Sequence, residues 1–163
     1  MGRRVYFAFH YQKDISRVNV VRNSWVMQER EAAGFYDASL WEKAKKQGDD
    51  AIKRMINNGL WGTSVTVFLL GAETAGRPWV RYELQKSYEN GNGLLAIYIH
   101  NIKNFQSRVS YQGTNILDQF HITDAWGRQT YLSQIYRTYD WMSNDGYKNF
   151  GEWVEEAARI AGK

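Results

Sequence analysis

Two short apolar runs constrain most strongly what this chain can fold into. Val65–Leu70 and Leu94–Ile99 are apolar at nearly every position, without the alternation of a strand that has one face in water. Such runs are typical of strands in a parallel sheet that is buried on both faces. Segments with apolar residues at helical spacing stand before, between and after the two runs. We therefore predict an α/β fold in three layers, with a central parallel sheet flanked by helices.

The remaining elements follow from the same patterns. Further strands are predicted at 4–9 and, from a weaker signal, at 34–37. The capping-box pattern Ser39–Glu42 predicts the start of a helix that continues past Ile56 and ends before Gly59. The other predicted helices cover residues 15–25, 78–89, 132–139 and 147–161, and residues 101–128 are expected to be loop with short elements. The short crossovers favour a flavodoxin-like arrangement.

The composition indicates one folded domain over residues 1–163. Hydrophobic residues make up 44% of the chain and aromatic residues 15%, which is enough for a sizeable core. The net charge of +4 is spread along the chain, so it would attract an anionic ligand without requiring nucleic acid. The absence of cysteine excludes disulfides, thiolate zinc sites and a cysteine nucleophile. With no apolar N-terminal region and no run long enough to span a bilayer, we expect a cytoplasmic protein without membrane contact.

Several chemistries that occur on this fold lack their motifs here. A phosphoacceptor receiver domain needs acids at the end of the first strand, where Phe9–Gln12 stand instead. A flavodoxin needs a hydroxyl- and glycine-rich phosphate loop there, and no Walker A or G-x-G-x-x-G motif follows any predicted strand. His10, His100 and His121 lack the spacing of metal ligands, so no metal site is expected. A Ser-His-Asp triad stays open, although no nucleophile elbow is present.

The stretch Trp79–Glu83 is the strongest candidate for a functional site. Gly76–Pro78 opens a helix, because proline's missing N–H costs least in the first turn. Glu83 is then expected beyond the C-terminal end of the strand at 65–70, the edge where open α/β sheets bind ligands. The four-residue spacing puts Trp79 and Glu83 on one helical face, where a ring and an acid can hold a planar group and stabilise a positive charge. The structural alternative is a core ring beside an acid that favours a helix N-terminus.

Five stretches resemble one family when they are taken together. They are Arg4–Tyr11, Arg17–Asn23, Phe35–Glu42, Trp79–Glu83 and Tyr136–Trp141. In order and content they resemble the TIR domain, and most closely the bacterial TIR-like group that includes ThsB of the Thoeris anti-phage defence system. The resemblance spans nearly the whole chain, and the combination is more specific than the Trp-x-x-x-Glu motif alone.

The resemblance implies an enzyme that cleaves the nicotinamide–ribose bond of NAD. NAD is then the substrate, and no further cofactor or metal is expected. It also implies a cyclic ADP-ribose isomer as product, a second messenger that is made after phage infection and activates a partner effector protein. The family's catalytic glutamate falls on Glu83, the tryptophan of the motif on Trp79, and the substrate-lining end of the first strand on Phe9 and His10. Many TIR domains carry a serine where this chain has Ala8, so substrate binding here must proceed without that hydroxyl.

The implied chemistry suits these residue types. Departure of cationic nicotinamide leaves an oxocarbenium-like ribose, as in glycoside cleavage. One positioned carboxylate can stabilise that ribose, and no second acid is needed because the leaving group requires no proton. Cyclisation also needs walls that exclude water and stack a base. Trp79 and Phe9 are the expected aromatic walls, with Trp41 or Tyr82 as further candidates.

Two polar candidates each have a structural alternative. His10 follows the first strand, where a diphosphate or ribose would lie, but a loop histidine bonded to backbone explains it equally well. Asp37 ends the predicted second strand and would face the same cleft, but capping the next helix explains it as well. We keep both residues, with Tyr82, as candidate substrate-binding residues.

Two classes of function stay open at this point. The first is an NAD-consuming enzyme whose product reaches an effector protein. The second is a non-catalytic TIR-like module that acts by assembly with other TIR domains or binds a nucleotide without turnover. Self-association or a phage-derived trigger is a possible requirement in either class, and neither nucleic acid nor a membrane is expected as a partner.

Overall fold

A single parallel sheet organises the protein. The structure is a computed structural model that describes residues 3–26, 32–33, 35–36 and 38–163. Within these residues the strands lie in the order β2 (Ala32–Ala33), β1 (Val5–Ala8), β3 (Val65–Leu70), β4 (Gly93–Tyr98) and β7 (Thr138–Asp140), and all neighbours are parallel. This is the flavodoxin-like order, so the predicted fold class is confirmed. The order reverses between β1 and β3, and this reversal fixes where a ligand site is expected.

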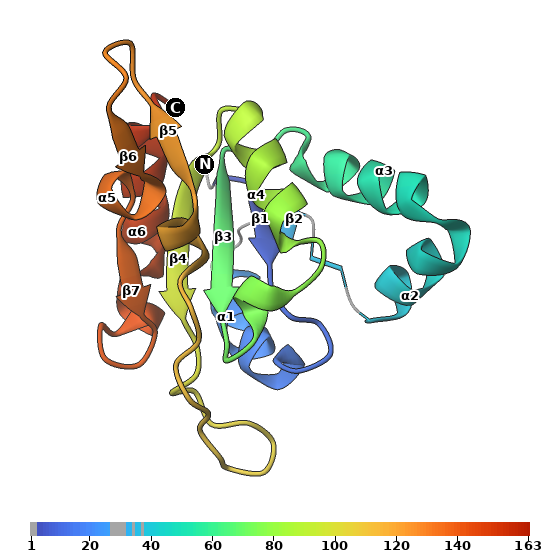
Figure 1. Cartoon of the computed structure of the whole chain (residues 1–163). Helices are drawn as coiled ribbons and strands as arrows, with labels where there is room; N and C mark the ends of the chain where they lie inside the picture. Colours follow the sequence, from blue (N-terminus) through green and yellow to red (C-terminus); the bar gives the residue numbers. More distant parts are fainter. Residues whose placement is uncertain (1–2, 27–31, 34, 37) are drawn as a thin grey trace.

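Helices cover both faces of the sheet (Figure 1). Helices α1 (Ile15–Val26) and α6 (Gly146–Ile160) lie on one face, where Trp25 packs against Phe150 with ring centroids 4.9 Å apart. Helices α3 (Asp49–Leu60) and α4 (Val80–Glu89) contact β1, β3 and β4 on the other face. The strands β1 and β3 are buried at every position, as the apolar runs predict.

Alternation along β1 divides its side chains between the two helical layers. Phe7 contacts Phe150 of α6, with ring centroids 6.2 Å apart. The neighbouring Tyr6 points to the opposite layer, where its hydroxyl reaches Glu83 of α4. Successive side chains of a strand point to opposite faces, so this register brings Tyr6 beneath α4.

The helix predicted from Ser39 to beyond Ile56 is divided into two. Helix α2 (Ala38–Gln47) ends before Gly48, which has a φ of 102°, and α3 begins at Asp49. A positive φ of this size suits glycine and interrupts a right-handed helix. The predicted boundaries are therefore wrong: Ser39 lies inside α2 rather than at its cap, and Gly59 lies inside α3.

The predicted second strand is also misplaced. Strand β2 is Ala32–Ala33, and the described residues Phe35 and Tyr36 lie after it in irregular backbone. Gly34 and Asp37, which completed the predicted strand, lie outside the described residues.

The C-terminal third contains the largest error of the sequence prediction. The helix expected over 132–139 is only α5 (Leu132–Ile135), and β7 begins at Thr138. The spacing of Leu132, Ile135 and Tyr139 imitates a helix, but Tyr139 stacks on Trp153 of α6 at 4.2 Å while its backbone pairs with β4. The region 101–128 does carry short elements, as expected: η2 (Ile116–Gln119) and β5 (His121–Thr123), which pairs with β6 (Gln129–Tyr131). The final helix is confirmed as α6.

The described residues contain neither a membrane-spanning helix nor a cluster of metal-ligating side chains. No described helix combines the length and the apolar character needed to cross a bilayer. No group of three or more histidine, aspartate or glutamate side chains in the described part of the chain is placed to hold a metal ion.

Candidate active site

The point where the strand order reverses holds a cavity of about 320 Å³. Its lining comes from the residues that follow β1 and β3, with Thr114 from the loop after β4. We call it the switch-point cavity and define it by His10, Glu73, Gly76, Arg77 and Thr114. Open α/β sheets bind ligands at this position, because parallel strands on either side send their connections in opposite directions.

The loop after β3 is folded back by its own side chains. The Thr74 hydroxyl accepts a hydrogen bond from the Gly71 amide at 2.8 Å and donates to the Leu69 carbonyl at 3.2 Å. Gly71 has no room for a side chain, because a Cβ there would collide with the Asp14 carboxylate. These contacts fix η1 (Thr74–Gly76) and bring Arg77 to the cavity wall.

Glu83 lies on the first turn of α4 and is buried, with 1% of its surface exposed. The Tyr6 hydroxyl donates to its Oε2 at 2.5 Å, and Nη2 of Arg77 forms an ion pair with its Oε1. Arg77 also lines the switch-point cavity, whereas Glu83 is not among the described residues that line it. The predicted catalytic carboxylate is therefore next to the cavity wall and is held there by two polar partners.

A chain of hydroxyls seats α4 on the sheet. Ser87 donates to the carbonyl of Glu83 at 2.6 Å, and Thr66 of β3 donates to the Ser87 hydroxyl at 2.7 Å. Asn92 donates to the Thr66 hydroxyl at 3.1 Å. Each hydroxyl in this hydrogen-bonded series has a partner in the core, as a buried polar group requires. The position of Glu83 is thus set by strand β3 as well as by its own helix.

Arg77 occupies a buried and aromatic environment. Only 6% of its surface is exposed, and its guanidinium carbon lies 4.9 Å from the ring centroid of Trp41. The Trp41 ring in turn stacks on Tyr11, with ring centroids 5.5 Å apart and planes 2° from parallel. Burial lowers the pKa of Arg77 to about 10, with the Tyr6 and Tyr11 hydroxyls acting against that change. Arg77 is therefore still a cation at neutral pH and balances the Glu83 carboxylate.

Burial also raises the pKa of Tyr6 well above its usual range, although the positive charge of Arg77 acts in the opposite direction. Tyr6 therefore stays protonated at physiological pH and can donate a hydrogen bond to Glu83. A neutral donor and a cation on one carboxylate give that group a fixed orientation.

Trp79 and Tyr82 lie together at a second cavity, of about 610 Å³. Their rings meet edge to face with centroids 5.5 Å apart. Phe120 and Pro78 also line this space, which we call the aromatic cavity. Pro78 lines the switch-point cavity as well, so the two hollows adjoin at the residue between Arg77 and Trp79. The Glu83 amide donates to the Trp79 carbonyl at 3.0 Å, and Trp79 is the N-cap residue directly before α4.

The other predicted site residues fall in three different places. His10 lines the switch-point cavity, and its Nδ1 accepts a hydrogen bond from the Lys13 amide at 3.2 Å. Burial lowers the pKa of His10, and the charge of Arg77 lowers it further while Glu73 opposes both. Phe9 is buried against Phe35, with ring centroids 4.9 Å apart, and is not brought together with Glu83. Asp37 lies outside the described residues.

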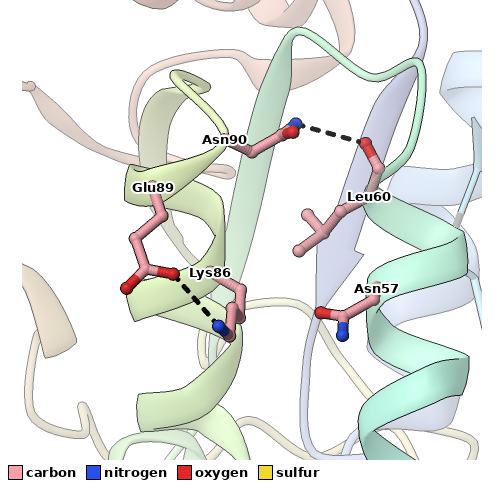
Figure 2. Close-up of a pocket in the computed structure, with 5 residues that line it drawn as sticks. All are labelled: Asn57, Leu60, Lys86, Glu89 and Asn90. Atoms are coloured by element: carbon pink, nitrogen blue, oxygen red, sulfur yellow. Dashed lines mark hydrogen bonds and ion pairs between the residues drawn. The ribbon is translucent and has the colours of Figure 1, made fainter.

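A polar hollow of about 330 Å³ lies between α3 and α4, toward the C-terminal end of α4. It is lined by Asn57, Leu60, Lys86, Glu89 and Asn90 (Figure 2). Leu60 ends α3 just before β3, and Asn90 follows α4 just before β4, so the hollow belongs to the N-terminal edge of these strands. That edge is opposite to the one where such sheets bind ligands. Its Lys86–Glu89 pair, 3.1 Å apart, is half-exposed.

Sequence patterns missed two residues of the site, Tyr6 and Arg77. Tyr6 carries a hydroxyl in the otherwise apolar strand β1, and Arg77 is a cation directly before the proline that precedes α4. Both are signals of a buried polar contact, but neither indicates the partner. The partner depends on which face of β1 lies beneath α4.

The fold and the site together define a class of protein: a flavodoxin-like α/β domain with a buried, paired carboxylate beside its switch-point cavity. Residues 6–104 match the family model described as Thoeris protein ThsB, TIR-like domain. A Bacillus cereus (strain MSX-D12) protein described as "Putative cyclic ADP-D-ribose synthase ThsB1" is 41% identical over 191 residues, covering 94% of this chain and 100% of that protein. The chain belongs to the ThsB TIR-like domain family, and the resemblance found in its sequence is confirmed.

Proposed function

We propose that this protein cleaves the nicotinamide–ribose bond of NAD and converts the remainder to a cyclic ADP-ribose isomer, with Glu83 as the catalytic carboxylate. Membership of the ThsB family supports the proposal, as does the similarity to a protein whose name describes a cyclic ADP-D-ribose synthase. The observation that carries the residue assignment is the Glu83 carboxylate, held by Tyr6 and Arg77 beside the switch-point cavity.

The proposed roles follow from charge and shape. Nicotinamide leaves as a neutral ring, and the ribose that remains develops positive charge at its anomeric carbon. A carboxylate oriented in advance by Tyr6 stabilises that charge without reorganising water. Trp79 and Tyr82 offer aromatic surfaces for a planar ring in the adjoining cavity. His10, neutral at physiological pH, offers a hydrogen bond to a ribose or phosphate at the end of β1.

The biological role that we propose is signalling in anti-phage defence. The cyclic product would act as a second messenger that reaches a partner effector protein, and a phage-derived trigger or self-association would activate synthesis. We place the activity in the cytoplasm, where NAD is available. A cysteine-free composition suits that reducing compartment. NAD enters as substrate, and we propose neither a cofactor nor a metal.

The direct test measures nicotinamide released from NAD by purified protein and by lysate of phage-infected cells. Glu83→Gln should lower the rate by about a hundredfold or more, the scale of losing one electrostatic stabiliser of a transition state. Glu89→Gln is the matched control, because it changes the same residue type on the same helix at an exposed position. Turnover by Glu83→Gln at the wild-type rate would refute the assignment. No turnover by any form, with nucleotide binding retained, would favour a non-catalytic module.

A further inference from the structure

Arg77 is the one described side chain that joins the catalytic carboxylate to the cavity. It lines the switch-point cavity and forms an ion pair with Oε1 of Glu83. As long as this pair persists, a ribose in the cavity meets a guanidinium rather than a free carboxylate. Catalysis by Glu83 therefore requires Arg77 to change its partner.

The guanidinium is incompletely satisfied in its buried position. Its Nε is buried and has no hydrogen-bond partner among the described residues. An arginine carries five N–H donors in a planar fork, which matches two oxygens of a phosphate better than one carboxylate oxygen. The unpartnered Nε belongs to a residue that already lines an open cavity, and an anion there gains this donor when the guanidinium turns from Glu83 toward the cavity.

The remaining charges around the cavity permit an anion. Glu73 lines the cavity, but its carboxylate pairs with Lys13 at 3.7 Å, so these two charges offset each other. His10 is neutral at physiological pH, since burial lowers its pKa. Arg77 is then the cation in the cavity wall at the ends of β1 and β3, where a dinucleotide's diphosphate is commonly bound in such sheets.

We propose that Arg77 binds the diphosphate of NAD in the switch-point cavity and, in doing so, releases Glu83 from its ion pair. The inference rests on the proposed function and adds a substrate-binding residue to it. Binding of the correct dinucleotide and exposure of the catalytic carboxylate are thereby coupled. A nucleoside without phosphates leaves the Arg77–Glu83 pair closed and is a poor substrate.

The test uses ligand binding, so it does not depend on turnover. ADP-ribose carries the diphosphate and adenosine lacks it, and calorimetry measures the affinity of the full chain for each. Glu83→Gln removes the charge that competes for Arg77, so this variant should bind ADP-ribose about threefold or more tightly than the wild type. The double variant Glu83→Gln/Arg77→Met should bind ADP-ribose about tenfold more weakly than Glu83→Gln. Adenosine affinity should stay within about twofold in all forms.

Two further variants keep the test decisive. Arg159→Met removes an exposed cation near the end of α6, and its ADP-ribose affinity should equal that of the wild type. Arg77→Lys keeps the charge that balances Glu83 and loses the planar fork, so it serves if the double variant does not fold. Its affinity for ADP-ribose should fall several-fold while adenosine binding is unchanged.

The inference is overturned if Glu83→Gln binds ADP-ribose no more tightly than the wild type and removal or replacement of Arg77 changes that affinity no more than Arg159→Met does. This failure differs from failure of the proposed function. Selective loss of ADP-ribose binding in Arg77 variants of a protein that releases no nicotinamide would support Arg77 as the diphosphate ligand and refute the cleavage activity.

Discussion

Helix α4 carries two glutamates that each pair with a cation, and the two pairs differ in almost every physical respect. Glu83, on the first turn, meets Arg77 in the core and accepts a hydrogen bond from Tyr6. Glu89, on the last turn, pairs with Lys86 (Figure 2). Their side chains are 50% and 36% exposed. Two glutamates at opposite ends of one helix thus belong to a buried, oriented site and to a solvated pair.

The difference teaches what makes a carboxylate a candidate catalyst. Water screens the Glu89–Lys86 pair, and hydrogen bonds from Lys86 and Gln85 simply lower the pKa of Glu89. Glu83 is buried, so its pair with Arg77 is screened much less and its two partners set the orientation of the carboxylate. Position relative to the sheet completes the contrast, because only Glu83 lies beside the switch-point cavity.

The largest expected contrast is in stability. Arg77→Met leaves the Glu83 carboxylate buried without a counter-charge, so the free energy of unfolding should fall by about 3–5 kcal/mol. Lys86→Met removes the corresponding cation of the exposed pair and should leave the unfolding midpoint nearly unchanged. Urea denaturation of both variants measures the difference. Equal midpoints would mean that the buried pair is as dispensable as the surface pair.

A smaller difference in stability is expected between two tyrosines whose hydroxyls bond to helices on the same face of the sheet, Tyr6 to α4 and Tyr82 to α3. Tyr6→Phe removes a hydrogen bond to a buried charge and should lower the free energy of unfolding by about 1.5–3 kcal/mol. Tyr82→Phe removes only an exposed contact to Asn57, 3.4 Å long, and should leave stability unchanged. Denaturation curves recorded side by side test both. A Tyr6→Phe protein as stable as Tyr82→Phe would show that Glu83 does not depend on the Tyr6 hydroxyl.

A third contrast separates buried from exposed aspartates by pH. Burial raises the pKa of Asp14 from 3.8 to about 6, although Arg17 acts against the change. The folded protein then binds this proton more tightly than the unfolded chain, so the contribution is fully present below pH 3.8 and is lost as pH rises through 6. Above pH 6 the buried Asp14 carboxylate costs the folded state about 3 kcal/mol. Relative to Asp14→Asn, the wild type should therefore lose stability between pH 4 and pH 7.

Asp124 provides the control of opposite sign. Hydrogen bonding from the Arg128 amide lowers the pKa of Asp124, so its contribution is present at neutral pH and is lost on acidification. The unfolding midpoint of Asp14→Asn should change relative to the wild type between pH 4 and pH 7, whereas that of Asp124→Asn should change only below pH 4 and in the opposite direction. Parallel curves would mean that burial of Asp14 does not govern its titration.

The sequence predicted the fold wherever local pattern and tertiary environment agree. The apolar runs at 65–70 and 94–99 became β3 and the greater part of β4 because buried parallel strands need no alternation. The helix at 132–139 failed because Thr138–Asp140 pairs with β4, and strand pairing outweighs an apolar spacing that also fits a helix. The break at Gly48 was missed because a glycine in a helical pattern does not reveal its φ angle.

The site was predictable only in the part that a local sequence pattern describes. Trp79 and Glu83 are detected by spacing after a strand. The structure brings Trp79 to the aromatic cavity and Glu83 against Arg77, which lines the switch-point cavity. The ion pair with Arg77 and the bond from Tyr6 require the register of β1 against α4, which no local pattern contains. The position of Arg77 between Glu83 and the cavity likewise depends on tertiary packing.

The measurement that tests the central claim most directly is mass analysis of nucleotides from phage-infected cells that express the wild type, Glu83→Gln or Glu89→Gln. We expect NAD loss and a cyclic ADP-ribose isomer in cells with the wild type and Glu89→Gln. Cells with Glu83→Gln should keep their NAD and lack the product. A cyclic product equally abundant in Glu83→Gln cells would contradict the account, because the buried carboxylate at the switch point would then not be the group that cleaves NAD.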